Sequence, residues 1–256
     1  MVNQFSRNEL AFGKEGVEQL KNASVAVLGI GGVGSFAAEA LCRSGIGRLI
    51  LIDKDVIDIT NLNRQIHALH HTIGLPKVEV MAKRLKEINP NIEVVPLQMF
   101  YTKETNLEIF QHKIDFLVDA SDTITYKIHI ILQCLKRAVS FISCMGAANK
   151  LDPTQLKIAD IFATKYDPIA KVIRRELRKA GVKQGVPVVY SEESPIVTRE
   201  DIRKEIVSNE NHPIRKLRQP PASNAFVPST AGLICASYVV RELTKNIPIQ
   251  RVNSYM

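Results

Sequence analysis

The stretch SVAVLGIGGVG, residues 24–34, sets the fold that we expect for this chain. It begins as a short apolar run, typical of a strand that is buried on both faces. Residues 35–42 follow with the spacing of a buried helix. The turn between them carries four glycines, at Gly29, Gly31, Gly32 and Gly34. Bare backbone N–H groups at the start of a helix favour phosphate, so the pattern predicts a nucleotide site.

An acidic residue further along the chain supports this interpretation. Asp53 ends the next apolar run, 19 residues after Gly34 (53 − 34), where a carboxylate accepts hydrogen bonds from ribose hydroxyls. The glycine turn and Asp53 alone do not separate NAD from ATP, because both molecules offer a ribose and an anionic phosphate chain.

Polar residues downstream favour ATP over NAD. Asn61, Arg64 and Lys77 follow the strand that ends at Asp53. A dehydrogenase does not need cations at a terminal phosphate, whereas adenylation must stabilise the negative charge that moves onto pyrophosphate. Asp122 follows a later strand and can add a ligand for Mg²⁺ in the same crevice.

The same alternation of apolar runs and helical spacing extends along most of the chain. It predicts strands at 24–30, 48–53, 92–100, 115–120, 140–147, 156–162 and 186–191. Helices are expected at 35–42, 77–89, 103–112, 125–137, 168–180 and 229–244. Alternating strands and helices form a parallel sheet with right-handed crossovers. The fold class is therefore α/β, with a doubly wound, Rossmann-like and mostly parallel sheet.

The pattern becomes less regular after residue 150. We expect an ATP-binding, Rossmann-like adenylation domain at 1–150 and a C-terminal α/β extension at 151–256, packed on the same core. Residues 194–221 contain Pro213, Pro220 and Pro221 among charges of both signs, which predicts a mobile loop.

Basic charge is concentrated in one segment of the C-terminal extension. Residues 165–183 hold seven basic and two acidic residues, 7 − 2 = +5 of the net +8 of the whole chain. A helix over 168–180 would place its cations opposite its apolar side. A solvated helix is the plain alternative, but the concentration of charge predicts a surface for a nucleic-acid phosphate backbone, formed by Lys171, Arg174, Arg175, Arg178 and Lys179.

Composition bounds the remaining possibilities. The 256 residues are 45% hydrophobic and 23% charged, as in an ordinary globular protein. The four cysteines form no C-x-x-C pair, which argues against a zinc ribbon or a secreted disulfide framework and favours the cytoplasm. Residues 1–16 lack an apolar core of a signal peptide, and no apolar run approaches the length of a membrane span, so we expect no membrane insertion.

Residues 5 to about 150 resemble the ubiquitin-activating-enzyme-like superfamily, which includes bacterial adenylating proteins of molybdopterin and thiamine synthesis. The resemblance is carried by GIGGVG, LIDKD, NLNRQ, GLPK and DASD in this order. It implies that Asp53 binds ribose and that Asn61, Arg64 and Lys77 bind phosphate. It also implies that Asp122 binds Mg²⁺ and that Arg7 reaches across a homodimer to the partner's ATP.

From residue 147 onward the chain resembles one branch of that superfamily, the tRNA threonylcarbamoyladenosine dehydratases. Enzymes of this branch use ATP to adenylate the carboxylate of N6-threonylcarbamoyladenosine at tRNA position 37. The neighbouring carbamoyl group then closes a ring and AMP leaves, a net cyclodehydration. The resemblance implies this activity, with tRNA as partner, and leaves room for a sulfur-transfer partner protein.

Three other functions stay open on the sequence. One is adenylation of the C-terminus of a small ubiquitin-like sulfur carrier, although related activators often carry the paired C-x-x-C ligands that this chain lacks. Another is an NAD-dependent oxidoreductase, because the glycine motif with Asp53 fits by itself. The third is a nucleotide sensor without catalysis, which leaves the phosphate and Mg²⁺ residues unexplained.

Overall fold

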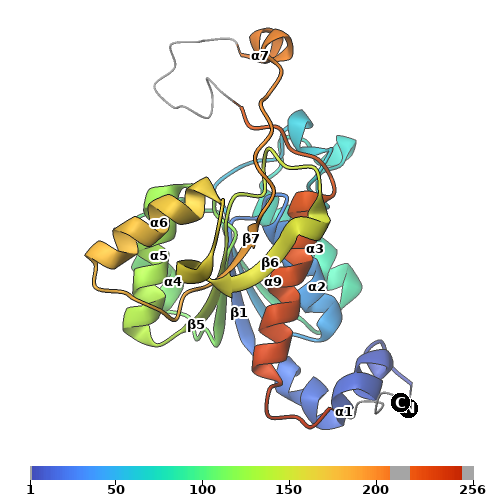
Figure 1. Ribbon diagram of the computed structural model, residues 1–256. Coiled ribbons are helices and arrows are strands. Elements are labelled where there is room, and N and C mark those ends of the chain that lie inside the picture. The colour runs from blue at the N-terminus through green and yellow to red at the C-terminus, as the bar shows by residue number, and fades with distance from the viewer. Residues whose placement is uncertain (1, 208–219, 250–256) are drawn as a thin grey trace, which may run out of the picture.

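A seven-stranded sheet forms the centre of the computed structural model, which describes residues 2–207 and 220–249 (Figure 1). The strand order is β3-β2-β1-β4-β5-β7-β6. Neighbouring strands are parallel except β6, which pairs antiparallel with β7 at one edge. The strands are β1 Ser24–Leu28, β2 Arg48–Ile52, β3 Glu93–Leu97, β4 Phe116–Asp119, β5 Ser140–Cys144, β6 Leu156–Asp160 and β7 Pro187–Ser191. The expected doubly wound α/β fold is confirmed.

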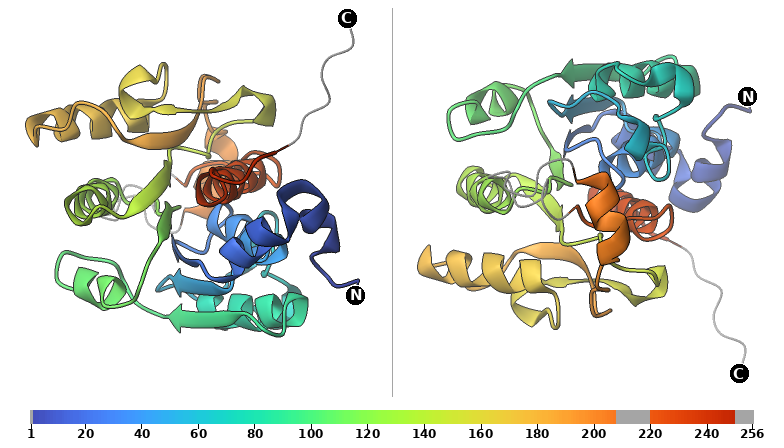
Figure 2. Two further views of the ribbon diagram at one scale, coloured as in Figure 1. Left: turned by 90° about the horizontal axis from the view of Figure 1, so that it is seen from below. Right: turned by 90° about the horizontal axis from the view of Figure 1, so that it is seen from above.

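Helices cover both faces of this sheet, as Figure 2 shows from two sides. The helix bounds are α1 Ser6–Lys21, α2 Gly34–Ser44, α3 Lys77–Ile88, α4 Asn106–Phe110, α5 Ile124–Arg137, α6 Pro168–Lys179, α7 Glu200–Ile206 and α9 Val227–Leu243, of which α7 projects beyond the sheet and covers neither face (Figure 1). Val25 and Val27 of β1 belong to the core under α2, α3 and α9. Ala26 and Leu28 belong to the core under α4, α5 and α6. Every residue of β1 is buried, which explains why its sequence is apolar throughout after Ser24.

The order of the strands places a crevice at the carboxyl end of β1. From β1 the chain builds outward to β2 and β3 on one side, and then returns to add β4 on the other. Loops leaving β1 and β4 therefore diverge at this point, where ligands of doubly wound sheets bind. Gly29 follows β1 with a φ of +89°, and a Cβ there would lie 2.8 Å from the carbonyl oxygen of Ala120. Only glycine lets the two loops approach so closely.

The second half of the chain extends the same sheet. Strand β7 pairs with β5, and β6 then covers the edge of β7. Helix α9 packs on α2, and a Cβ at Gly232 would overlap the carbonyl oxygen of Val33. The change of pattern at residue 150 therefore does not coincide with a break in the core.

Several sequence expectations differ from the structure. The expected helix at 103–112 forms only over Asn106–Phe110, and the expected strand at 92–100 only over Glu93–Leu97. Helix α1 was not expected at all. It is kinked at Gly13, where φ is +69°, and its buried residues are Gly16, Val17 and Leu20.

Within 194–221, where a mobile loop is expected, residues 200–206 form the short helix α7 (Figure 1). Acidic residues in its first turn and basic residues in its last turn complement the helix dipole. Asn149 ties both sides of this excursion together, since its carbonyl accepts from Ile196 and its Oδ1 accepts from Ala222, both at 2.8 Å. Residues 208–219 lie outside the described residues. Among the described helices, none is long and apolar enough to span a membrane.

Candidate active site

The glycine turn offers one open face at the carboxyl edge of the sheet. A Cβ at Gly34 would overlap the carbonyl oxygen of Gly29, and one at Gly32 would press on Pro228 at 3.0 Å and Arg64 at 3.3 Å. These two glycines serve close packing. At Gly31 the nearest atom to a Cβ would be the Gln65 amide nitrogen, at 4.0 Å. Gly31 therefore leaves space that protein atoms do not fill.

Asp53 is held directly behind this turn. Its Oδ2 accepts from the N–H of Ile30 at 2.7 Å, and its Oδ1 accepts from the N–H of Asp55 at 2.9 Å. Burial raises the pKa of Asp53, and the charge of Lys77 opposes that rise. The turn and the expected ribose ligand therefore form one hydrogen-bonded unit.

Lys77 enters the site from the first residue of α3. Its N–H donates to the carbonyl of Asp55 at 3.1 Å, and its Nζ lies 3.3 Å from Asp55 Oδ2. The side chain is only 8% exposed. An isolated bridge between Val56 and Pro76 closes the excursion of the chain between β2 and α3. This closure brings a residue 24 positions after Asp53 (77 − 53) back beside it.

Asn61 and Arg64 lie on the same excursion. Asp58 caps the short helix that contains Asn61, and Asn61 Oδ1 accepts from the N–H of Asp58 at 3.3 Å. Arg64 Nη1 donates to the carbonyl of Thr60 at 2.7 Å, which fixes its side chain next to Gly32. Burial lowers the pKa of Arg64. The structure therefore gathers the glycine turn, Asp53, Asn61, Arg64 and Lys77 at one edge of the sheet.

Gln65 is a polar residue of this site that the sequence did not single out. It is 5% exposed, its amide faces Gly31, and its Oε1 has no hydrogen-bond partner among the described residues. An unsatisfied buried oxygen beside an open phosphate-type turn fits a site completed by a ligand. The sequence signal that could have identified Gln65 was its position next to Arg64 in the NLNRQ motif.

Asp122 lies in the loop after β4, on the same edge of the sheet. Its side chain is exposed, and its Oδ1 accepts from the Thr123 hydroxyl at 3.4 Å. No cluster of three or more His, Cys, Asp or Glu residues suited to a metal occurs in the described part of the chain. Mg²⁺ is usually held by one or two carboxylates together with substrate phosphates, so a single carboxylate at the crevice suits it.

Asp119, also in the DASD segment, was missed by the sequence reasoning as a residue of interest. It is fully buried and bonds to Lys127, Ser143 and Ser121, all within 3.1 Å. A lysine one helical turn into the following helix was the only sequence signal for this group.

Arg7 is not brought to the glycine turn of its own chain. It is exposed on α1, which lies near the end of the sheet where the parallel strands begin, away from the glycine turn (Figure 1). There Asn8 Nδ2 donates to the carbonyl of Arg43 at 3.0 Å, and Phe5 lies 3.6 Å from the Cβ position of Gly45. Both contacts are to the end of α2 that is far from the turn.

Helix α6 forms where expected, but its cations are not equally available. Arg174 Nη1 donates to the Ile161 carbonyl and to both the carbonyl and the hydroxyl of Thr164, at 2.6 to 3.0 Å. Arg174 is only half-exposed, because its Nη1 anchors the chain before α6, so its charge is less available than that of the other cations. Arg175 and Lys179 both pair with Glu176 and stay exposed. Lys171 and Arg178 are also exposed.

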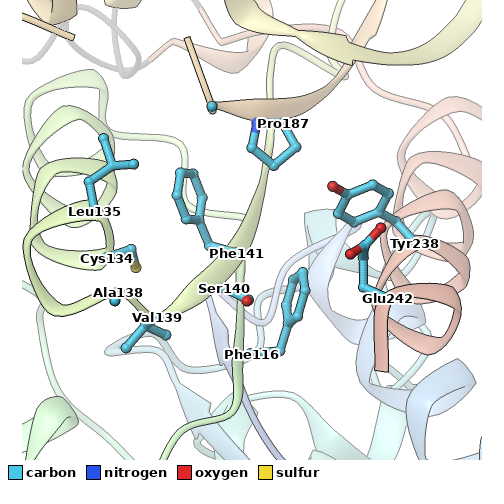
Figure 3. Close-up of a pocket in the computed structure, with 11 residues that line it drawn as sticks. Phe116, Cys134, Leu135, Ala138, Val139, Ser140, Phe141, Pro187, Tyr238 and Glu242 are labelled. Carbon is cyan, nitrogen blue, oxygen red and sulfur yellow. The ribbon is translucent and has the colours of Figure 1, made fainter. Parts of the chain in front are cut away.

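A cavity of about 300 Å³ opens at the amino edge of the sheet (Figure 3). Its lining includes the first residues of three strands, Phe116, Ser140 and Pro187, with Tyr238 and Glu242 from α9. The glycine turn lies at the other end of β1, so this cavity is separate from the candidate site.

The cysteines do not provide an exposed nucleophile. Cys42, Cys134, Cys144 and Cys235 are all buried and unpaired. Burial raises the pKa of Cys42 to about 11, and it also raises the pKa of Cys134. Neutral buried thiols are poor nucleophiles. The interpretation of Cys144 and Cys235 as small core residues fits their burial.

A glycine turn at the switch point, with a buried carboxylate and two cations beside it, is the arrangement typical of nucleotide-binding members of the doubly wound folds. The chain belongs to the ThiF family, whose model matches residues 5–254.

Individual relatives narrow this family. A tRNA threonylcarbamoyladenosine dehydratase of Bacillus subtilis (strain 168) is 62% identical over 252 residues, 98% of this chain and 99% of that protein. The structure of the E. coli tRNA N6-threonylcarbamoyladenosine dehydratase in complex with ATP matches with a TM-score of 0.83 at 31% identity, covering 95% of this chain and 94% of that one. A molybdopterin-synthase adenylyltransferase of Haemophilus influenzae is 32% identical over 138 residues, 54% of this chain and 56% of that protein.

Proposed function

We propose that this protein is an ATP-dependent tRNA threonylcarbamoyladenosine dehydratase. It adenylates the carboxylate of N6-threonylcarbamoyladenosine at tRNA position 37, and the adjacent carbamoyl group then closes the ring and releases AMP. The observation that carries the proposal is the convergence of the glycine turn, Asp53, Asn61, Arg64 and Lys77 at one edge of the sheet. The extent of the similarity to the B. subtilis and E. coli dehydratases supports the choice of substrate.

The residues at this edge fit ATP. Gly31 leaves room at the turn, and the N–H groups at the start of α2 suit the phosphates. Asp53 keeps lone pairs for the ribose hydroxyls in addition to its two backbone bonds. Gln65 Nε2, which faces Gly31, can donate to a phosphate oxygen there. NAD does not need the cations Arg64 and Lys77 at this place, which favours ATP.

The chemistry follows from where charge moves. An oxygen of the substrate carboxylate attacks the α-phosphorus of ATP, the bond to the bridging oxygen breaks, and pyrophosphate leaves with its electron pair. Arg64 and Lys77 are already fixed in place by Thr60, Asn63 and Asp55, so they stabilise this charge without reorganising. The carbamoyl group then attacks the acyl carbon, AMP leaves, and one proton is released.

Asp122 is the residue that we assign to Mg²⁺. A bound Mg²⁺ would neutralise phosphate charge at the crevice. The Asp122 carboxylate is exposed at the carboxyl edge of the sheet, where it and the phosphate oxygens of the nucleotide could bind the same Mg²⁺.

The remaining parts of the proposal concern assembly. Lys171, Arg175, Arg178 and Lys179 would contact the tRNA backbone, with Arg174 supporting the helix from below. Arg7 lies too far from its own turn, so its role requires a homodimer in which it serves the partner's ATP. The buried, unpaired thiols suit a reducing cytoplasm, and a sulfur-transfer partner would have to supply the reactive sulfur itself.

One experiment separates the proposed function from its alternatives. The protein is incubated with ATP and tRNA that carries threonylcarbamoyladenosine, tRNA that lacks it, or a sulfur-carrier protein ending in Gly-Gly, and AMP release is measured. The proposal requires AMP only with the modified tRNA, together with loss of one water from the nucleoside by mass spectrometry. Pyrophosphate release with the sulfur carrier, leaving AMP in the carrier acyl-adenylate until a nucleophile displaces it, would instead support the alternative that the H. influenzae relative suggests.

A further inference from the structure

We propose that the buried Asp119–Lys127 ion pair positions the nucleotide site by fixing the loop at 120–123. The inference rests on the proposed function for the meaning of that site. It assigns a role to two residues that contact neither the glycine turn nor the phosphate-binding excursion through their side chains.

The pair is completely enclosed and completely satisfied. Asp119 is 0% and Lys127 2% exposed. Lys127 Nζ donates to Asp119 Oδ2 at 2.8 Å, to the Ser143 hydroxyl at 3.3 Å and to the Asp119 carbonyl at 3.4 Å. Ser143 donates in turn to Asp119 Oδ2 at 2.6 Å. The three elements β4, β5 and α5 are thus joined by one polar group in an apolar interior.

The other carboxylate oxygen of Asp119 shapes the loop. Oδ1 accepts from the backbone N–H of Ser121 at 3.1 Å and from its hydroxyl at 2.7 Å. The next residue in the chain is Asp122, the assigned Mg²⁺ ligand. On the other side Ala120 donates its N–H to the Leu28 carbonyl at 2.8 Å, and its own carbonyl stands against Gly29. The loop therefore connects the ion pair with both the glycine turn and Asp122.

Energetics argue that this connection is more than packing. A buried ion pair loses the hydration of two charges, and an apolar pair of the same size is often equally stable or more so. Stability alone gives no reason for a charged group at this position. A fully bonded polar network does define one geometry, as residues behind a metal ligand commonly do.

Lys127 acts through the loop and not on the nucleotide. All the partners of its ammonium group lie beneath the loop, in Asp119 and Ser143. Both residues are accordingly positioning residues. Removing both charges together should preserve the fold and loosen the loop, whereas removing Lys127 alone leaves an unpaired buried carboxylate.

The test uses three variants. The first is a double variant that combines Asp119→Asn and Lys127→Met, the second is the conservative Lys127→Arg, and the third is the control Lys136→Met. Lys136 is exposed on the same helix. Calorimetry measures ATP binding over a Mg²⁺ titration and with the metal chelated, in the full-length protein without tRNA. We expect the double variant to melt near the wild-type temperature, and its Mg²⁺ midpoint to rise about tenfold or more. Lys127→Arg should have a Mg²⁺ midpoint close to that of wild type, and Lys136→Met should match wild type.

Failure of this inference is distinct from failure of the proposed function. A double variant that melts normally and keeps the wild-type Mg²⁺ midpoint would show that the pair only fills space. A double variant that does not fold would equally overturn the positioning role, because the pair would then be needed for stability. Absence of AMP release with modified tRNA, while wild-type Mg²⁺-dependent ATP binding persists, would overturn the tRNA substrate and leave the positioning role standing.

Discussion

The glycine-turn edge and the basic surface of α6 were both predicted from polar or charged residues in the sequence, but the two regions differ in how many of those side chains remain available to a ligand. At the turn, residues from Gly29 to Lys77 converge, and their side chains are held beside an open space. On α6, five cations lie close together in the sequence. Arg174, however, donates hydrogen bonds to the segment before the helix, and both Arg175 and Lys179 form ion pairs with Glu176.

The difference lies in what each pattern encodes. Ends of neighbouring parallel strands must meet at one edge of the sheet, so motifs at those ends predict a shared location. Helical spacing predicts only the side of the helix on which a residue lies. It does not show whether a neighbouring carbonyl or carboxylate already satisfies the charge.

Loss of Lys77 should have the largest effect and sharpen this contrast most. Lys77→Ala removes a preorganised cation, so AMP formation should fall by roughly two to three orders of magnitude while tRNA affinity stays near wild type. Lys83→Ala, at an exposed position of the same helix, is the control and should keep its activity. The measurement is AMP release under saturating tRNA. Activity of Lys77→Ala within a factor of a few of wild type would remove Lys77 from the phosphate site.

Gly31→Ala tests the open face of the turn. The added methyl meets no protein atom closer than 4.0 Å, so the melting temperature should be unchanged or slightly higher. The methyl does occupy the space assigned to phosphate, and ATP affinity should drop about tenfold or more by calorimetry. Normal ATP affinity with normal stability would place the nucleotide elsewhere.

A mixture of two inactive chains tests the role of Arg7. If Arg7 serves the partner's site, heterodimers of Arg7→Ala and Lys77→Ala contain one site built only of intact parts. With free exchange of subunits, half of the dimers are mixed and half of their sites are intact, so about a quarter of wild-type activity should return. Proven exchange without recovery would exclude action across the dimer.

The smallest effects are expected on α6, where two neighbouring cations should behave differently. Lys171→Ala should lower tRNA affinity and flatten the plot of log affinity against log salt by a little under about one unit. Arg174→Ala should instead lower stability by about 1 to 3 kcal/mol, because bonds to Ile161 and Thr164 are lost. Binding in a salt titration and thermal unfolding distinguish the two. Equal salt slopes for both variants and wild type would make α6 only a solvated surface.

The centre of the fold was predictable because its strands are buried on both faces. β1, β2 and β4 have mostly apolar sequences, and their predicted positions agree with the structure to within two residues. Prediction was poorer where burial is partial. β3 lies at an edge of the sheet with mostly half-buried residues, and its expected range of 92–100 was too long.

The candidate site was predictable to the extent that its residues lie in motifs at strand ends. Gln65 and the Asp119–Lys127 pair were not, for a physical reason. Their importance comes from burial and from partners on other elements, such as Ser143 on β5. Neither property is visible in spacing along one element. The anchoring bonds of Arg174 were not predicted for the same reason, because its partners precede the helix that carries it.

The packing of α9 on α2 bears on when, during synthesis, the enzyme becomes competent. Pro228 stands against Gly32, and Gly232 stands against the first turn of α2. A nascent chain that has emerged only as far as β7 contains all the residues that we assign to ATP, but it lacks the helix that backs their turn. Domains commonly acquire native packing as units during translation. ATP binding should therefore arise late, after α9 has left the ribosome, and incomplete chains should not consume ATP.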